Sequence, residues 1–390
     1  MKCLLVHPGT QYAPQLALQL FRHDLLEKYI SSFVVSEFSL THKIFGARLR
    51  KRVISGLPTD KIKIYPSAEM VQRINRLFTE SSERSWYARN SFFQERVIYN
   101  DIRAGVTTIG FDTSSWKMAE YCKTKGFRFI LDVSIGHSVS KEKVFSHVRA
   151  RFPEWKDVST AKSQHMMALE QREYEAASVI VVPSGFVKGT LVENNVDPAK
   201  IVVNPFGTEI PSSDFSFKGH REKTVFLFFG SLTARKGLPV VLEAWQALEK
   251  SNVELIVAGY GELPRGVVLP ENVTLMGAIS ASKRGELFRQ ADVLVFPSYF
   301  EGFAQVQLEA AAHGLPIIGT KNSGAEEIVI HGENGFIMQP GSTKELVHLM
   351  KLLIEDRKLL TAMSRKIRER IQFFSWDSYG DRWKTLLENN

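Results

Sequence analysis

The chain has little cysteine and no long apolar run. Only Cys3 and Cys122 occur among its 390 residues, and both have apolar neighbours. This argues against a disulfide-stapled secreted module and predicts buried thiols in a reducing cytoplasm. Since no run reaches about 18 apolar residues, no transmembrane helix is predicted. The opening MKCLLVHPGT has too short an apolar part for a secretion signal and is interpreted as a first strand with its loop.

Several chemical signatures are also missing from the sequence. No His, Cys and Asp residues show metal-ligand spacing, and neither a Gly-x-Ser-x-Gly nor a P-loop run is present. No repeat with a period of about 20 to 50 residues is visible. The sequence contains no recognised nucleic-acid-binding module. We therefore expect chemistry that uses no metal and no cofactor, and no nucleic-acid partner.

Length and composition favour a two-domain α/β protein. With 390 residues, of which 44% are hydrophobic, the chain can bury two cores. Its net charge of +8 is uneven: residues 1–215 hold 29 basic and 22 acidic residues (+7), and the remainder holds 21 and 20 (+1). The basic excess is densest in Lys43–Lys63, where apolar residues alternate with cations. This segment suits an anionic membrane surface, and a solvated helix or loop is the alternative.

The first half alternates strand-like and helical patterns. KCLLVH predicts a first strand, followed by a loop that contains Gly9, and leucine spacing predicts a helix over Ala13–Tyr29. We expect a second strand over Ser32–Phe38, and helices with loops over residues 39–100. His137 follows the strand pattern FRFILDV and should lie at the carboxyl end of that strand. A lone histidine here can also serve as a hydrogen-bonded structural residue.

The stretch around which the chain is organised runs from Val295 to Glu327, and its first strand begins at Val293. It predicts a buried strand, a loop with Glu301 and Gly302, a helix and a further strand, which is the parallel α/β unit. Ligands of such units bind at the carboxyl end of the strand, where a helix start offers free N–H groups. Gly302, Phe303 and Ala304 fall at this point.

Two carboxylates flank this helix start. Glu301 precedes the helix and Glu309 follows eight positions later, so they can border an anion pocket and accept sugar hydroxyls. The alternative is an ordinary crossover in which Glu301 caps the helix and Glu309 is solvated. Upstream, the loop GSLTARKG places Arg235 and Lys236 before a helix. Two cations there suit a diphosphate, and a pair of surface charges is the alternative.

The run PSYFEGFAQVQLEAAAHGLPIIGT resembles the family 4 retaining glycosyltransferases of GT-B fold, which carry a Glu, seven residues, Glu motif. The likeness extends from LFFGSLTARKGLPVVLEAW to NSGAEEIVIHGENGFIMQPGS. It implies two Rossmann-like domains that face a cleft. We expect an acceptor-binding domain over residues 1–215, a nucleotide-sugar-binding domain over 216–375, and a helix over 376–390 that crosses back onto the first domain.

The resemblance also implies roles for individual residues. Lys236 matches the family's lysine, whereas Ser231 stands where an arginine is common, so Arg235 is expected to replace it. The expected catalytic residues are Glu301, His137 and Lys236, and the expected donor-binding residues are Gly9, Arg235, Lys236, Ile279, Gly302, Phe303, Ala304 and Glu309. Ile279 would contact the base and Glu309 the ribose, while Glu301 would hold the transferred sugar.

The implied activity is transfer of a sugar from a UDP- or GDP-sugar to a hydroxyl of a glycan or lipid-linked acceptor, in cell-surface polysaccharide or glycolipid assembly. Three alternatives remain at this stage: a nucleotide-sugar epimerase, a phosphorylase, and a non-catalytic membrane-associated scaffold of the same fold. We expect a cytoplasmic protein, with Lys43–Lys63 as the candidate contact to the inner face of the membrane.

Overall fold

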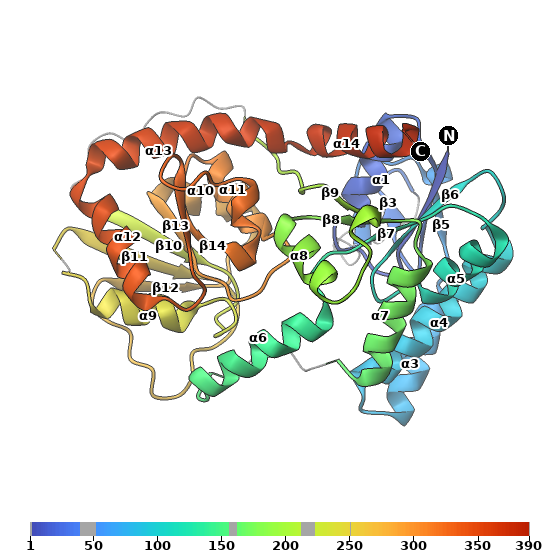
Figure 1. Ribbon diagram of the computed structural model, residues 1–390, viewed down its shortest axis with the longest axis horizontal. Helices are drawn as coiled ribbons and strands as arrows, with labels where there is room; N and C mark the ends of the chain where they lie inside the picture. The colour runs from blue at the N-terminus through green and yellow to red at the C-terminus, as the bar shows by residue number, and fades with distance from the viewer. Residues whose placement is uncertain (1, 40–51, 156–161, 212–222, 250, 390) are drawn as a thin grey trace.

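The computed structural model describes residues 2–39, 52–155, 162–211, 223–249 and 251–389. It contains two separate parallel sheets covered by helices, joined by a connection before residue 224 and by helices that return at the end of the chain (Figure 1). Residues 43–51 of the predicted membrane contact Lys43–Lys63 lie outside the described residues. In the described part of the chain, no helix is both long and apolar enough to cross a membrane.

The first sheet has seven strands in the order β5-β2-β1-β6-β7-β8-β9, and every neighbouring pair is parallel. The strands are β1 Cys3–Val6, β2 Leu26–Ser31, β5 Ile62–Ile64, β6 Thr107–Phe111, β7 Phe129–Asp132, β8 Val179–Val182 and β9 Ile201–Val203. A separate short pair consists of β3 Val35–Ser36 and β4 Val53–Ile54. The central strands are buried on both faces, which explains their nearly continuous apolar sequences.

The predicted boundaries of the first helix and the second strand were wrong. Helix α1 spans Ala13–Arg22 and ends before Asp24, which has a φ of 55°. The leucines that follow, interpreted above as a continuing helical stripe, instead begin β2 and pair with β1. Leu25 and Leu26 fit either period, so spacing alone did not reveal the turn. The strand expected over Ser32–Phe38 is therefore displaced to Leu26–Ser31.

Among the described residues of the first half, six further α-helices follow: α3 Ser67–Phe78, α4 Ser82–Asn100, α5 Trp116–Lys125, α6 Ser138–Arg151, α7 Gln164–Ala176 and α8 Gly185–Glu193. The expectation of helices with loops over residues 39–100 is met by α3 and α4, although β4 and β5 also lie there. Helix α6 was not anticipated, since its apolar residues show little periodicity.

The second sheet has six parallel strands in the order β12-β11-β10-β13-β14-β15. The strands are β10 Thr224–Phe229, β11 Val253–Ala258, β12 Val273–Gly277, β13 Val293–Phe296, β14 Ile317–Thr320 and β15 Gly335–Met338. Its helices are α9 Leu238–Gln246, α10 Ala281–Gln290, α11 Gln305–Ala312, α12 Thr343–Glu355 and α13 Arg357–Arg370. The strand, helix and strand predicted over the stretch that ends at Glu327 are present as β13, α11 and β14.

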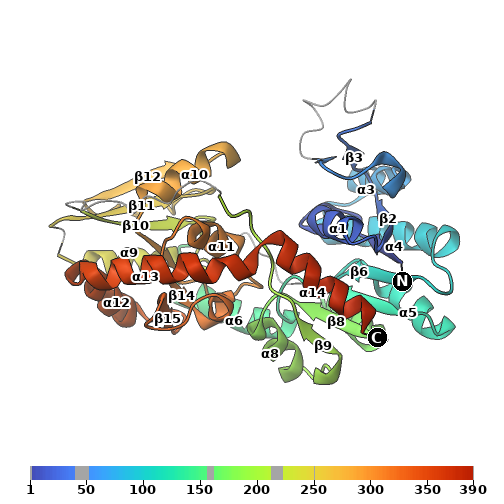
Figure 2. The same cartoon turned by 90° about the horizontal axis from the view of Figure 1, so that it is seen from above.

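The final helix α14, Trp376–Glu388, returns to the first half of the chain as predicted. It packs on α1, where its Trp383 is fully buried, and Arg22 Nη1 lies 2.8 Å from Asp377 Oδ1. Figure 2 shows α13 and α14 running one after the other across both halves. The second half is therefore linked to the first both by the segment that precedes β10 and by α14 after α13.

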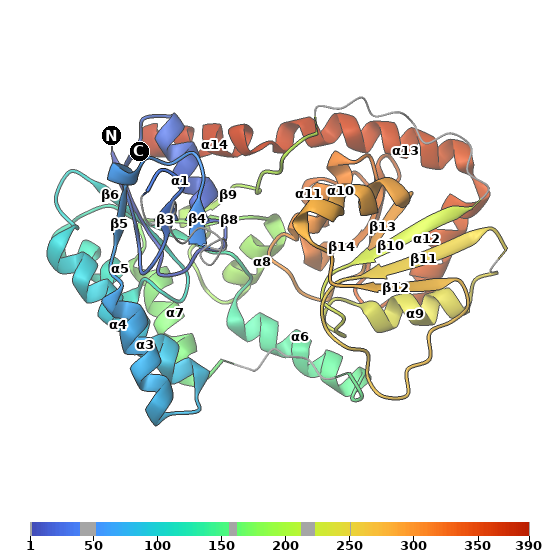
Figure 3. The same cartoon turned by 180° about the vertical axis from the view of Figure 1, so that it is seen from behind.

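Helix α6 forms another bridge between the halves. It begins at the carboxyl edge of the first sheet and extends toward α9 of the second half (Figure 3). Beyond its last turn, Phe152 and Trp155 pack into the apolar core that includes Trp245. Arg151 donates to the carbonyl of Gly341 at 2.6 Å and pairs with Glu243 at 3.1 Å. The end of α6 is thus anchored on the second half.

Candidate active site

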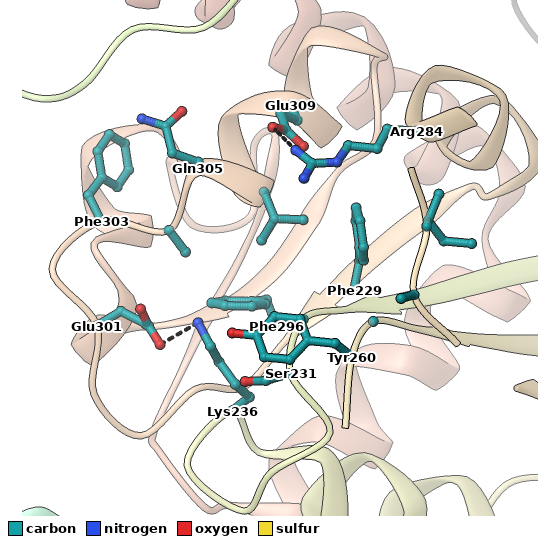
Figure 4. A pocket seen from close by; sticks show the side chains of 16 residues that line it. Phe229, Ser231, Lys236, Tyr260, Arg284, Phe296, Glu301, Phe303, Gln305 and Glu309 are labelled. Atoms are coloured by element: carbon teal, nitrogen blue, oxygen red, sulfur yellow. Dashed lines mark hydrogen bonds and ion pairs between the residues drawn. The ribbon is translucent and has the colours of Figure 1, made fainter. Parts of the chain in front are cut away.

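A pocket of about 350 Å³ lies at the carboxyl ends of β10, β11, β12 and β13 (Figure 4). Its residues come from four strand ends and from the start of helices α10 and α11. The lining consists of Phe229, Gly230, Ser231, Lys236, Gly259, Tyr260, Ala278, Ile279, Arg284, Phe296, Glu301, Phe303, Ala304, Gln305, Val306 and Glu309. This is the edge where parallel α/β sheets bind ligands.

One end of the pocket holds a buried charge cluster. Lys236 Nζ lies 2.5 Å from Glu301 Oε1, and Arg235 pairs with the same oxygen. Burial raises the pKa of the Glu301 carboxyl, but the neighbouring Lys236 and Arg235 outweigh this effect and hold its pKa below the ordinary value. Burial also lowers the pKa of Lys236, against the opposing effect of Glu301. Two cations thus share one carboxylate, which leaves net positive charge for an anion.

The position of Lys236 depends on the glycine that follows it. Gly237 has a φ of 80°, and a Cβ there would lie 2.2 Å from the carbonyl oxygen of Pro297. Only glycine tolerates both the left-handed backbone and this close approach. The turn ends the loop and begins α9 at Leu238, and the Lys236 ammonium lies 5.1 Å from the ring centre of Phe296. The short loop therefore holds its cation against the pocket floor.

Helix α11 directs its first turn toward the same pocket. It begins at Gln305, and its N-cap residue Ala304 has no side chain that can accept a hydrogen bond from the first N–H groups. The first N–H groups of a helix have no partner within the helix and carry partial positive charge. With Phe303 and Ala304 in the lining, this helix start can bind a phosphate oxygen.

The other end of the pocket holds Glu309 and Arg284. Arg284 Nη1 lies 2.9 Å from Glu309 Oε1, and the guanidinium is 5.7 Å from the ring centre of Phe229. Burial raises the pKa of the Glu309 carboxyl, while Arg284 opposes this effect. Figure 4 shows this pair across the pocket from Glu301 and Lys236. Ile279 is also part of the pocket lining.

The structure thus brings six of the predicted site residues into one pocket: Lys236, Ile279, Glu301, Phe303, Ala304 and Glu309. Arg235 lies behind it, where it donates to the carbonyl of Phe300 at 3.1 Å. Gly302 faces the first half instead: a Cβ there would lie 1.8 Å from the carbonyl oxygen of Ser134, and its own carbonyl accepts from Ser184 Oγ at 2.6 Å. Gly302 therefore permits close contact between the halves.

His137 and Gly9 do not line this pocket. His137 is the N-cap of α6, where its Nδ1 accepts from the Val139 N–H at 3.2 Å, and burial lowers its pKa. Gly9 donates its N–H to Nδ1 of His7 at 2.9 Å. Both lie at the carboxyl edge of the first sheet, as expected from their place after β7 and β1. Their predicted roles in a reaction remain predictions.

Sequence reasoning missed Arg284, Phe229 and Tyr260 as lining residues. Arg284 follows Ile279 by five positions and begins the next helix, so its place near this edge could be inferred. That its side chain points toward Glu309 could not be inferred, because the neighbouring Lys283 carries the same charge and is exposed.

Comparison with known proteins agrees with this geometry. Residues 211–370 match the family model described as glycosyl transferases group 1. The chain is 24% identical over 240 residues to the capsular polysaccharide biosynthesis glycosyltransferase CapM of Staphylococcus aureus, covering 55% of this chain and 63% of CapM. It is also 24% identical over 245 residues to the lipopolysaccharide 1,2-N-acetylglucosaminetransferase of Salmonella typhimurium, covering 58% and 61%. The chain thus spans somewhat more than half the length of these relatives.

Solved structures show the same fold along the whole chain. Sucrose-phosphate synthase from Thermosynechococcus elongatus superimposes with a TM-score of 0.67 at 17% identity, covering 100% of this chain and 98% of that one. HepE of Anabaena, solved in complex with UDP-glucose, gives a TM-score of 0.63 at 16% identity and covers 100% of both chains. The chain therefore has the GT-B fold, and its residues 211–370 are similar to the glycosyl transferases group 1 family.

Proposed function

We propose that this protein is a retaining glycosyltransferase that moves a sugar from a nucleoside diphosphate donor to a hydroxyl of a glycan or lipid-linked acceptor. The observation that supports it most is the pairing of two carboxylates with separate cations at opposite ends of one pocket. Glu301 lies with Lys236, while Glu309 lies with Arg284. Between them, α11 begins without a side-chain cap. A nucleoside diphosphate sugar has matching groups in the same order.

The donor would lie with its base at Ile279 and its ribose hydroxyls at Glu309. Its diphosphate would contact Lys236 and the first N–H groups of α11, with Glu301 holding hydroxyls of the sugar. Negative charge grows on the diphosphate as the bond from the anomeric carbon to its oxygen breaks. Fixed cations and N–H groups that stabilise such charge contribute about 3 kcal/mol each to lowering the barrier.

The acceptor hydroxyl would attack the anomeric carbon from the face that the diphosphate leaves. Its proton would pass to an oxygen of the departing diphosphate, so that atoms and charges balance and the configuration is retained. Glu301 is occupied by two cations and is held ionised, which suits an electrostatic role beside the positive anomeric carbon better than a role as proton donor. We propose that the first half of the chain binds the acceptor across the cleft.

The test is a panel of UDP-, GDP- and TDP-sugars, measured first for thermal stabilisation and then for nucleotide release with and without a lipid-linked acceptor extract. We expect one nucleotide class to raise the melting temperature and release to require the acceptor. Binding at about 100 times the dissociation constant stabilises the folded state by about 2.7 kcal/mol, which such an assay detects.

The same panel separates the alternatives. Conversion of the donor sugar without acceptor would favour an epimerase, and a requirement for free phosphate would favour a phosphorylase. No stabilisation by any nucleotide sugar would contradict the proposal and favour a non-catalytic protein of the same fold. The retention of both carboxylates and of Lys236 in one pocket supports the transferase.

A further inference from the structure

Helix α3 presents a row of large apolar side chains to solvent. Met70, Ile74, Leu77 and Phe78, here named the α3 stripe, are 62%, 52%, 81% and 84% exposed. Their spacing of four, three and one places them on one side of the helix, whereas Ala68 and Gln72 are buried on the other. A surface helix ordinarily turns its apolar side inward, so this arrangement is reversed.

The stripe lies on a projecting part of the molecule. Helices α3 and α4 pack against each other and extend together beyond the first sheet, as both Figure 1 and Figure 3 show. Leu77 and Phe78 end α3 next to the turn at the tip, and the exposed Trp86 follows in α4. The apolar groups therefore stand on a convex tip, and a convex tip can enter a soft surface without a matching cavity in the partner.

Cations border the stripe. Arg73 and Arg76 lie beside it on α3, Arg84 begins α4, and all three are exposed. The acidic Glu69 of the same helix turns inward, where its carboxylate lies 3.9 Å from the guanidinium groups of Arg52 and Arg89. Glu80 in the turn is exposed and opposes the attraction in part. The stripe thus combines apolar insertion with flanking positive charge.

We propose that the α3 stripe docks this protein on an anionic lipid bilayer, with Leu77 and Phe78 entering the acyl boundary and Arg73 and Arg76 contacting lipid phosphates. Interfacial helices show this combination of a basic flank with Leu, Phe and Trp on the apolar side. The inference does not depend on the proposed transferase activity, nor on the Lys43–Lys63 segment. Lipid binding is measured without donor or acceptor, so its failure leaves the active-site proposal untouched.

The first experiment is co-sedimentation of the full chain with vesicles of phosphatidylcholine alone or mixed with phosphatidylglycerol. The variant M70S/I74S/L77S/F78S tests the stripe. A matched control, V268S/F373S, removes two other exposed apolar side chains, which are 81% and 67% exposed in the second half. We expect the wild type to bind mixed vesicles. The stripe variant should bind them at least ~tenfold more weakly, because four apolar side chains no longer enter the lipid. The control variant should bind as the wild type does. The variant R73Q/R76Q should bind mixed vesicles about fivefold more weakly for each arginine removed.

A second measurement avoids the risk that the fourfold variant misfolds. Both native cysteines are buried, so an introduced cysteine can be labelled selectively with an environment-sensitive fluorophore. We expect a label at L77C to move to an apolar environment when mixed vesicles are added, and a label at F373C to remain in water. Absence of wild-type binding, equal binding by the stripe variant, or an unchanged L77C signal would overturn the proposal. Lipid-independent self-association that the stripe variant abolishes would instead assign the surface to a second copy.

Discussion

The polar groups at the carboxyl ends of the two sheets have different surroundings. At the second sheet, Lys236, Glu301 and Glu309 line an open pocket with each carboxylate beside a cation. At the first sheet, the protein itself donates hydrogen bonds to most oxygens of the buried Asp132 and Glu173, although Oδ2 of Asp132 has no partner among the described residues. Tyr12 donates to Asp132 at 2.8 Å, and Glu173 accepts the backbone N–H groups of Thr113 and Ser115. One edge is arranged to meet a ligand, whereas the other is largely satisfied internally.

This difference shows why the donor side can be recognised from sequence. The pocket residues of the second half fall within residues 229–309, in four loops at strand ends. At the first edge, Tyr12 and Asp132 are 120 positions apart, and Thr113 and Glu173 are 60 positions apart. A local sequence motif can describe the pocket of the second half, whereas only the folded sheet brings the residues of the first edge together. Predictions that perturb each edge separately can test whether the contrast is functional.

The largest effect is expected at the open edge. Lys236→Ala should reduce turnover by about tenfold to a thousandfold, because a fixed cation no longer stabilises the leaving diphosphate. Initial rates at saturating donor measure this effect. Lys283→Ala, which removes an exposed lysine near the pocket, is the matched control and should leave the rate unchanged. Unchanged turnover in the Lys236 variant would remove this residue from the mechanism.

A smaller effect is expected at the other end of the pocket. Arg284→Gln should weaken UDP binding by about tenfold, since Arg284 holds Glu309 in position for the ribose. Titration calorimetry with UDP and with its 2′,3′-dideoxy analogue separates the contributions. If Arg284 acts through Glu309, its substitution should matter little for the dideoxy compound. An equal loss with both nucleotides would mean that Arg284 contacts the base or phosphates directly.

His137 lies at the edge of the first sheet and caps helix α6, which bridges the two halves, so it also tests the comparison. His137→Ala should lower the free energy of unfolding by about 1 kcal/mol, because the first turn of α6 loses its cap. His137→Asn should restore the cap. The role predicted from sequence further requires the Asn variant to lose at least ~tenfold in turnover at unchanged stability. Full turnover in that variant would assign His137 to the helix cap alone.

Much of the fold was predictable from the sequence, and the reasons are physical. The strand VLVF is buried on both faces and forms a continuous apolar run, so the strand, helix and strand around it were predicted, whereas the return of α14 was implied by the resemblance. The predicted helix boundary near Asp24 was wrong because a leucine-rich helix end passes directly into a leucine-rich strand start. Helix α6 was not predicted for another reason: it bridges two cores and so lacks one consistent apolar side.

The candidate site divides in the same way. Glu301, Glu309 and Lys236 occur in spaced motifs, so their convergence could be predicted before the structure was known. The inward direction of Arg284 depends on the packing of α10, which no spacing reports. Gly302 was predicted to bind the donor, yet its close approach to Ser134 belongs to the contact between the halves. Contacts between distant segments remain the part that sequence patterns do not encode.

At the closed edge of the first sheet, the expected effect is on stability rather than on turnover. Burial raises the pKa of Asp132 to about 8, with Tyr12 opposing and Asp112 adding to the shift. Between about pH 4 and 8 the folded protein then binds a proton that the unfolded chain has released. Stability should therefore fall as the pH rises through this window, by up to ~1.4 kcal/mol per pH unit from this group.

Urea unfolding at several pH values measures this slope. Asp132→Asn keeps a side chain of similar shape without the titrating group, so its slope should be smaller by that amount. The pH profile of turnover should change little, because the comparison makes this carboxyl a structural group of the first sheet. A turnover profile that lost an ionisation near pH 8 in the variant would place Asp132 in the reaction and make both edges functional.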